Sequence, residues 1–98
     1  MKKIDVIFQT DKLEQIKAIC NEMEIKEIIF SEVMLFNSDL QITKSYRGAH
    51  YQISHISKLK AEVIIPDDKE KAFIQKMDSL IDEEKGDSIT EYIVERVR

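Results

Sequence analysis

The sequence predicts an α+β fold, in which a four-stranded antiparallel sheet is covered on one face by two helices. Three observations lead to this prediction. The chain has 98 residues, which is enough for one hydrophobic core and a single domain spanning residues 1–98. Four segments show the alternation or the β-branched enrichment that is typical of strands. Two further segments repeat apolar residues at helical spacing.

The first half of the chain predicts a strand, a helix and a second strand. Residues 3–9 alternate, and the apolar set on one face is Ile4, Val6 and Phe8. Thr10 or Asp11 is the expected N-cap of the helix, because Asp11 and Glu14 have the spacing of a capping box. The buried stripe of this helix is Leu13, Ile16, Ile19, Cys20 and Met23. Residues 27–36 are rich in β-branched and aromatic side chains and predict the second strand.

The second half repeats the pattern of strand, helix and strand. Residues 58–65 alternate, with an inward set of Leu59, Ala61, Val63 and Ile65. Asp67 and Glu70 again have capping-box spacing, and Gly86 is expected to terminate the helix. The apolar stripe of that helix is Phe73, Met77, Leu80 and Ile81. Residues 89–97 predict the fourth strand.

The resulting order, β-α-β-β-α-β, is that of a ferredoxin-like sandwich. Its two helices cover only one face of the sheet. The side chains on the opposite face of the first two strands are also apolar, namely Ile7, Ile29, Val33 and Leu35. A sheet that is apolar on both faces predicts self-association through the uncovered face.

A long segment, residues 37–57, separates the second and third predicted strands without a stable core pattern. Loops longer than about 15 residues in compact domains usually have a function or are disordered. Residues 44–60 contain Lys44, Arg47, Lys58 and Lys60 and no acidic residue. The simple interpretation is a set of solvated lysines. The more specific interpretation is a binding site for an anion or an acidic partner.

Composition excludes several classes of function. The net charge of −4 argues against general nucleic-acid binding. No apolar run approaches the roughly 20 residues that span a bilayer, so a cytoplasmic location is expected. The lone Cys20 excludes a disulfide framework and a cysteine-based zinc site. No nucleophile, base and orienting residue can be assembled into a catalytic group, and a non-enzymatic protein is therefore expected.

Three segments carry a resemblance to a known family: "MKKIDVI" at the start, "YRGAHY" at residues 46–51 and "KLKAEVIIPDD" at residues 58–68. In combination and order they resemble the P-II nitrogen-regulatory signal transduction proteins. The resemblance implies a homotrimer whose long segment is the T-loop, an arm that contacts a membrane transporter or a metabolic enzyme. The arm residues expected to contact the partner are Tyr46, Arg47, Gly48, Ala49, His50 and Tyr51.

The resemblance also implies a small-molecule effector in a cleft between subunits, with ADP, AMP or ATP as candidate ligands. The matching effector residues are Phe36, Lys58, Glu62, Lys85, Gly86 and Asp87. Residues 83–88 correspond to a shortened phosphate loop, in which Glu83 and Glu84 would repel a triphosphate. The family pattern has glycine at several positions where this chain has Glu24, Glu27, Leu35 and Asn37.

Two alternatives remain open on the sequence. One is a trimer of similar architecture that binds a metal, as CutA-type proteins do, through His50 and His55. The other is a protein-binding module that needs no ligand. Tyr51 is either a modification target or, more simply, an exposed tyrosine that contacts a partner.

Overall fold

The computed structural model describes residues 1–36, 42–46, 49–53 and 55–94, with the backbone alone described in 42–46 and 49–53. Its strands are β1 (Lys2–Phe8), β2 (Ile29–Phe36), β3 (Ile42–Tyr46), β4 (Ala49–Ile53), β5 (His55–Ile65) and β6 (Ser88–Ile93). The helices are α1 (Leu13–Glu22) and α2 (Asp67–Asp78), and the 3₁₀ turns are η1 (Thr10–Lys12) and η2 (Glu83–Lys85).

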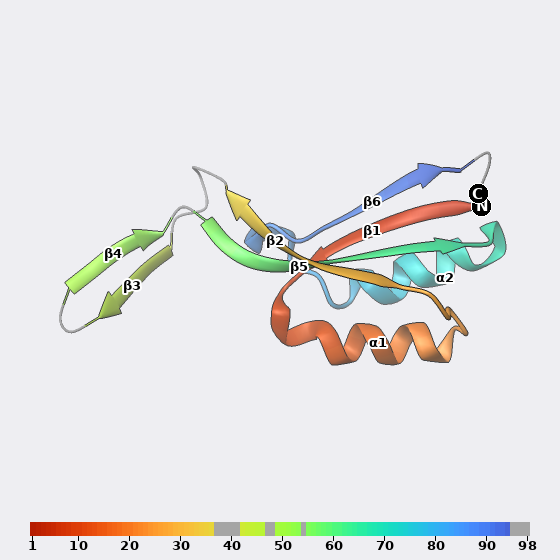
Figure 1. The fold of residues 1–98 in the computed structure, drawn as a ribbon, viewed down its shortest axis with the longest axis horizontal. Coiled ribbons are helices and arrows are strands. Elements are labelled where there is room, and N and C mark those ends of the chain that lie inside the picture. The colour runs from red at the N-terminus through yellow and green to blue at the C-terminus, as the bar shows by residue number, and fades with distance from the viewer. Residues whose placement is uncertain (37–41, 47–48, 54, 95–98) are drawn as a thin grey trace.

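The main sheet has the strand order β2-β5-β1-β6, with every neighbouring pair antiparallel. Both helices lie on the same face of this sheet (Figure 1). The predicted ferredoxin-like α+β fold is confirmed. Neither helix in the described part of the chain has the length and apolarity that crossing a bilayer requires.

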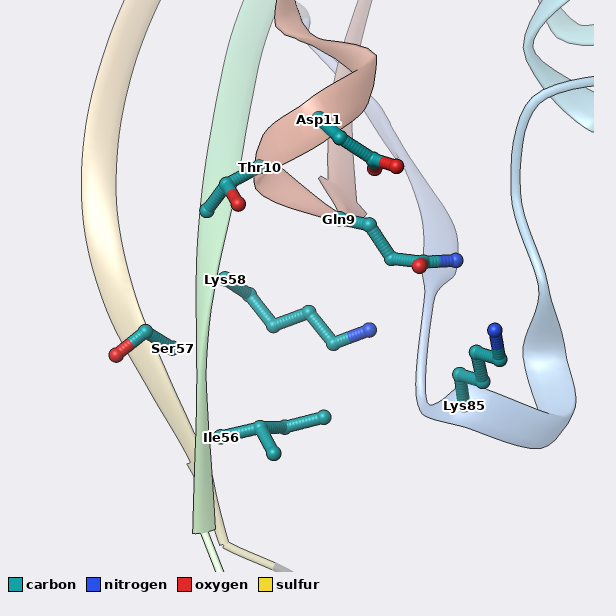
Figure 2. A pocket seen from close by; sticks show the side chains of 7 residues that line it. All are labelled: Gln9, Thr10, Asp11, Ile56, Ser57, Lys58 and Lys85. Carbon is teal, nitrogen blue, oxygen red and sulfur yellow. The ribbon is translucent and has the colours of Figure 1, made fainter.

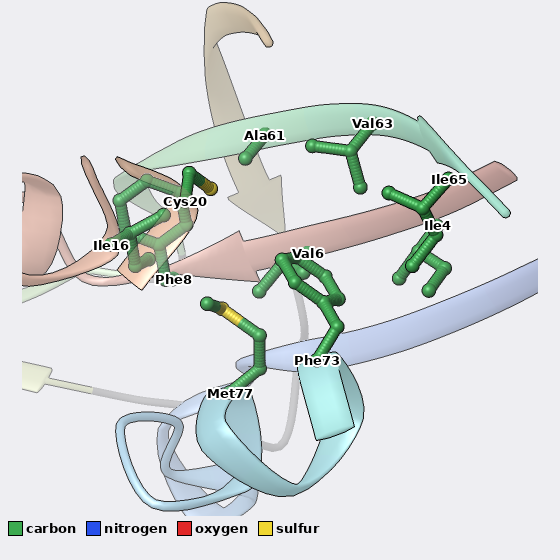
Figure 3. Packing of buried hydrophobic residues seen from close by; sticks show 10 residues of the cluster. All are labelled: Ile4, Val6, Phe8, Ile16, Cys20, Ala61, Val63, Ile65, Phe73 and Met77. Atoms are coloured by element: carbon green, nitrogen blue, oxygen red, sulfur yellow. The ribbon is translucent and has the colours of Figure 1, made fainter. Parts of the chain in front are cut away.

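The core lies between that face and the helices (Figure 3). The alternating set on β1 is fully buried, and β5 contributes its own alternate set from the neighbouring strand. Each helix adds two buried side chains, Ile16 and Cys20 from α1 and Phe73 and Met77 from α2. Cys20 therefore packs as a small apolar side chain, and burial raises the pKa of its thiol to about 11.

Both predicted capping boxes are wrong. α1 begins after a 3₁₀ turn, and its N-cap Lys12 makes no side-chain hydrogen bond to the helix. α2 begins at Asp67 behind the N-cap Pro66, whose fixed extended geometry suits a helix start. The Asp67 carboxylate instead lies 3.0 Å from the N-terminal ammonium, and acidic side chains in the first turn complement the helix dipole.

Three predicted boundaries also differ from the structure. α2 ends at Asp78, and Gly86 closes the separate turn η2 with a left-handed φ of 91°. β5 begins at His55, before the predicted start at residue 58, because residues 55–57 pair with the end of β2. β6 ends at Ile93, and residues 95–97 of the predicted strand lie outside the described residues.

The uncovered face of the sheet differs from the apolar surface that the sequence predicts. Its centre holds Lys3, Asp5, Lys60 and Glu62, with ammonium–carboxylate distances from 3.1 to 3.7 Å. The hydrogen bond between Lys60 and Glu62 raises the pKa of Lys60 and lowers that of Glu62. The predicted apolar residues flank this charged cluster, and Ile29 among them is 65% exposed. The uncovered face is therefore a charged centre with an apolar surround.

The end of α1 shows what replaces one glycine of the family pattern. Glu24 has φ 59°, the one left-handed non-glycine residue in the described ranges. The Glu24 and Ile25 amides donate to the carbonyls of Asn21 and Cys20, which are the two hydrogen bonds of a Schellman motif. A side chain with a Cβ is strained in this conformation.

We expect Glu24→Gly to stabilise the protein by about 0.5–1 kcal/mol, because glycine adopts positive φ without that strain. The measurement is the free energy of unfolding from urea denaturation. Ala18→Gly, at an exposed position of the same helix, is the control and is expected to destabilise by about 1 kcal/mol. A lower free energy of unfolding in Glu24→Gly would contradict the inference that Glu24 is strained.

β3 and β4 form a separate two-stranded antiparallel ribbon, with Ile42 opposite Ile53 and Tyr46 opposite Ala49. The ribbon extends beyond the end of the main sheet from which β2 and β5 lead (Figure 1). Part of residues 37–57 is thus regular β structure, although this segment has no stable core pattern in the sequence.

Candidate functional site

A pocket of about 440 Å³ lies where the end of β1, the turn η1, the start of β5 and the turn η2 meet (Figure 2). Its lining residues are polar or charged apart from one isoleucine, although carbon atoms of their side chains form most of the exposed wall. The lining residues are Gln9, Thr10, Asp11, Ile56, Ser57, Lys58 and Lys85. The antiparallel pairing of β1 with β5, which sets Phe8 opposite Leu59, places the chain segments on either side of the pocket together.

Lys58 is the buried cation of this site. Only 2% of its surface is exposed, and its side chain extends from β5 between Gln9 and the turn that carries Lys85 (Figure 2). The Lys58 Nζ lies 2.5 Å from Oδ1 of Asp87, which is itself only 3% exposed. A buried ammonium needs such a carboxylate, since an unpaired charge in the interior is strongly destabilising.

The turn η2 holds Asp87 in place. The Asp82 amide donates to Asp87 Oδ2 at 2.9 Å, and the Asp87 amide donates back to the Asp82 carbonyl at 3.2 Å. The Asp82 carboxylate in turn accepts the Glu84 amide. Gly86 lets the chain reverse with its positive φ. The turn therefore presents one carboxylate oxygen to Lys58 and keeps the other for its own backbone.

The structure brings four of the six predicted effector residues together. Lys58 and Lys85 line the pocket, and Gly86 and Asp87 follow Lys85 in the turn at its edge. Glu62 instead lines a second pocket of about 400 Å³ on the uncovered face, beside Ile29 and Ile64. Phe36 ends β2 opposite His55, is 69% exposed and does not line the pocket with Lys58.

The predicted arm residues fall largely outside the description. Arg47 and Gly48 lie outside the described residues. Tyr46 ends β3, and Ala49, His50 and Tyr51 begin β4, where the backbone alone is described. Their role in partner contact stays a prediction.

Sequence reasoning missed five lining residues: Gln9, Thr10, Asp11, Ile56 and Ser57. Thr10 and Asp11 were interpreted as helix caps, and the η1 turn instead exposes them beside β5. The available signal was the polar run that follows the first strand. The sequence does not show that this polar run lies beside the start of β5, because the pairing of β1 with β5 joins residues about fifty positions apart in the chain.

The pocket has the side chains of an anion-binding site, but its buried cation, Lys58, is already paired with Asp87. Lys85 is exposed across the pocket from Lys58, the Gln9 amide extends toward the space between them, and the Thr10 and Ser57 hydroxyl side chains lie on the β5 side of Lys58 (Figure 2). Asp11 is the carboxylate among the lining residues. Within the described residues, no group of three or more side chains could hold a metal ion. His55 of the predicted histidine pair is exposed at the start of β5.

Fold and site together define a small ferredoxin-like domain with a long insertion between the second and third strands of its main sheet. No protein-family model matches the chain. The chain is 37% identical over 68 residues to nitrogen regulatory protein P-II 1 of Escherichia coli K12, covering 69% of this chain and 61% of that relative. Nitrogen regulatory protein P-II of Rhizobium meliloti is 33% identical over 75 residues, covering 76% of this chain and 67% of the relative.

Nitrogen regulatory protein P-II of Azospirillum brasilense is 37% identical over 67 residues, or 68% of this chain and 60% of that relative. The chain belongs to the P-II family. It spans about 61% of the length of the Escherichia coli relatives that it matches. The predicted family resemblance is thus confirmed.

Proposed function

We propose that this chain is a non-enzymatic nitrogen-regulatory signalling protein that binds a small anionic effector and regulates a protein target through its arm, residues 37–57. The names of its relatives, nitrogen regulatory proteins, support the regulatory role. The target would be a membrane transporter or a metabolic enzyme, reached by a cytoplasmic trimer that is recruited to it.

The position of the pocket at the base of the arm carries this proposal. β5 begins at His55, within the last residues of the arm, and its next three residues, 56–58, line the pocket. Strand β2, which leads into the arm, pairs with the same segment of β5, with Leu35 opposite Ile56. A ligand in the pocket therefore acts on both strands that carry the arm, which suits an order–disorder switch.

The turn η2 favours an effector with fewer phosphates than ATP. The amides of Glu84, Lys85, Gly86 and Asp87 all donate to Asp82 or Glu83 within the turn. They are not free to cradle a triphosphate as a phosphate-binding loop does. Exposed Glu83 and Glu84 add like charge at the same place. ADP, AMP or an organic acid is thus the better candidate, with Lys58 and Lys85 as its cations.

The uncovered face supports assembly into a trimer. Ile29, Ile64 and Tyr92 are exposed on this face around the charged cluster of Lys3, Asp5, Lys60 and Glu62. Asp5 Oδ1 is buried without a hydrogen-bond donor among the described residues. Neighbouring subunits would cover the apolar side chains and supply polar partners at the centre.

The test is a thermal-shift panel of ATP, ADP, AMP, 2-oxoglutarate and divalent metals, run with limited trypsin digestion at Arg47. At a concentration of 100 times its Kd, the effector should stabilise the folded protein by about 2.7 kcal/mol. Cleavage at Arg47 should change at the same concentrations. Lys85→Gln should weaken both effects, and Lys76→Gln, an exposed lysine on α2 paired with Glu22, should leave them unchanged.

An arm cut at one rate with every ligand, and no thermal shift, would point to a protein-binding module without an effector. A response to metals alone that His50→Ala/His55→Ala abolishes would favour the metal-binding alternative. Both results would overturn the proposed effector site.

A further inference from the structure

We propose that Asp87 is an internal competitor of the effector: it occupies the Lys58 ammonium in the resting protein, and the anionic group of the effector must displace it. This inference rests on the proposed function, since it assumes that the pocket takes an effector. It assigns to Asp87 the opposite role from an effector-binding residue.

The contact geometry is the first support. Lys58 lines the pocket, but its side chain is only 1% exposed, so an anionic ligand could reach its ammonium only by opening the contact with Asp87 (Figure 2). Among the described residues, Asp87 is its one carboxylate partner, 29 positions away in the chain. Asp87 does not line the pocket but reaches Lys58 from the adjoining turn. The Asp87 carboxylate thus occupies the ammonium that a ligand would need.

The charge balance is the second support. The two lysines, Lys58 and Lys85, are balanced by the two carboxylates of Asp87 and Asp11 while Asp87 stays in place, and exposed Glu83 and Glu84 add negative charge nearby. An anion that entered without displacing Asp87 would meet two carboxylates and two lysines, one of which is neutralised by Asp87. An anion that replaces Asp87 at Lys58 meets two lysines and one carboxylate. Exchange at Lys58 is therefore the favourable route for binding.

The displaced carboxylate has structural consequences that suit a signal. Asp87 Oδ2 accepts the Asp82 amide, and the Asp87 amide closes the same turn, so departure of the side chain loosens η2. Lys58 lies on β5 only a few residues from the arm. One exchange of partners therefore changes the turn and the base of the arm together. Either a phosphate or a carboxylate group has the chemistry to make it.

The experiment measures the Kd of inorganic phosphate and, separately, of glutarate by amide NMR titration of the full chain. Asp87→Asn keeps the size of the side chain and an oxygen for the Asp82 amide but removes the competing charge. Because it leaves the Lys58 ammonium unpaired it is expected to lower stability, so its Kd is measured at a temperature at which the amide spectrum shows the variant folded. We expect it to bind one or both probes at least fivefold more tightly than the unsubstituted chain, within the roughly 5- to 150-fold range of typical couplings. The tighter probe identifies the anionic group.

Asp11→Asn is the matched control, because it removes one negative charge from the same pocket without touching Lys58. Its effect should be less than half that of Asp87→Asn on a logarithmic scale. Lys58→Met/Asp87→Asn removes both partners and so leaves no buried charge from this pair. It should not show the tighter probe binding of Asp87→Asn. The proposal would be overturned if Asp11→Asn and Asp87→Asn increased the affinity for the probe equally. It would also be overturned if the increase persisted when Lys58 was replaced.

These outcomes separate the inference from the proposed function. Tighter probe binding by Asp87→Asn, with no ligand of the panel acting on the unsubstituted chain, would support competition at Lys58 and contradict the effector role. An effector that binds the unsubstituted chain and Asp87→Asn equally well would contradict the competition and leave the effector role standing.

Discussion

Lys58→Met is expected to destabilise the fold by about 3–5 kcal/mol, the usual result of removing one partner from a buried ion pair. Asp87 would remain 3% exposed without its counter-charge, held in place by the Asp82 amide. Its carboxylate must then stay charged in a poorly solvated site, take up a proton, or break the turn to reach water, and each of these is unfavourable. Urea denaturation gives the free energy of unfolding.

The double variant Lys58→Met/Asp87→Asn should recover more than half of this loss, because replacing both charges removes the desolvated, unpaired group. Asparagine still offers an oxygen to the Asp82 amide. Lys76→Met serves as the control: its more exposed pair with Glu22 has a longer contact of 3.1 Å and is expected to contribute only about 0–1 kcal/mol. Equal decreases in the free energy of unfolding for Lys58→Met and Lys76→Met would contradict the burial of the Lys58–Asp87 pair.

Phe73→Ala is expected to destabilise the protein by about 3–5 kcal/mol. Phe73 is fully buried on α2, and its ring packs toward Val6 at the centre of the sheet (Figure 3). Truncation removes apolar contact and leaves a cavity that β1 and α2 cannot close without losing other contacts. Domains of this size have about 5–15 kcal/mol of total stability, so the variant should lie close to unfolding.

Phe36→Ala is the matched control for this substitution, since it truncates the same side chain at a position that is 69% exposed. We expect a change within about 0.5 kcal/mol. Denaturation curves of both variants, with equal slopes against urea concentration, would make the comparison valid. A large loss in Phe36→Ala and a small one in Phe73→Ala would reverse the assignment of the core.

The order of elements and the core were predictable from the sequence because both depend on periodicity. Ile4, Val6 and Phe8 alternate cleanly, and the apolar stripe of α1 appears in the structure as predicted. The helix starts were not predictable in the same way. Capping spacing is a short local signal, and the 3₁₀ turn before α1 and Pro66 before α2 determined the geometry instead.

The candidate site was predictable only in part. Lys58 and Asp87 each appeared among the expected effector residues, but their pairing did not. Lysine is almost never buried, and alternation places Lys58 on the face opposite to Leu59 and Ala61. Its burial depends on η2 folding over the start of β5, a contact between segments 29 positions apart. No local pattern encodes such a contact.

The charged centre of the uncovered face has a consequence for which chains can assemble with one another. A purely apolar face would accept any apolar surface of suitable shape, including that of a related protein in the same cell. Lys3, Asp5, Lys60 and Glu62 already pair with one another, so in the proposed assembly a facing subunit would have to fit this charge pattern without breaking the pairs. A subunit with a different pattern would leave charges desolvated and unpaired, so such a face would favour copies of the same chain over unlike ones.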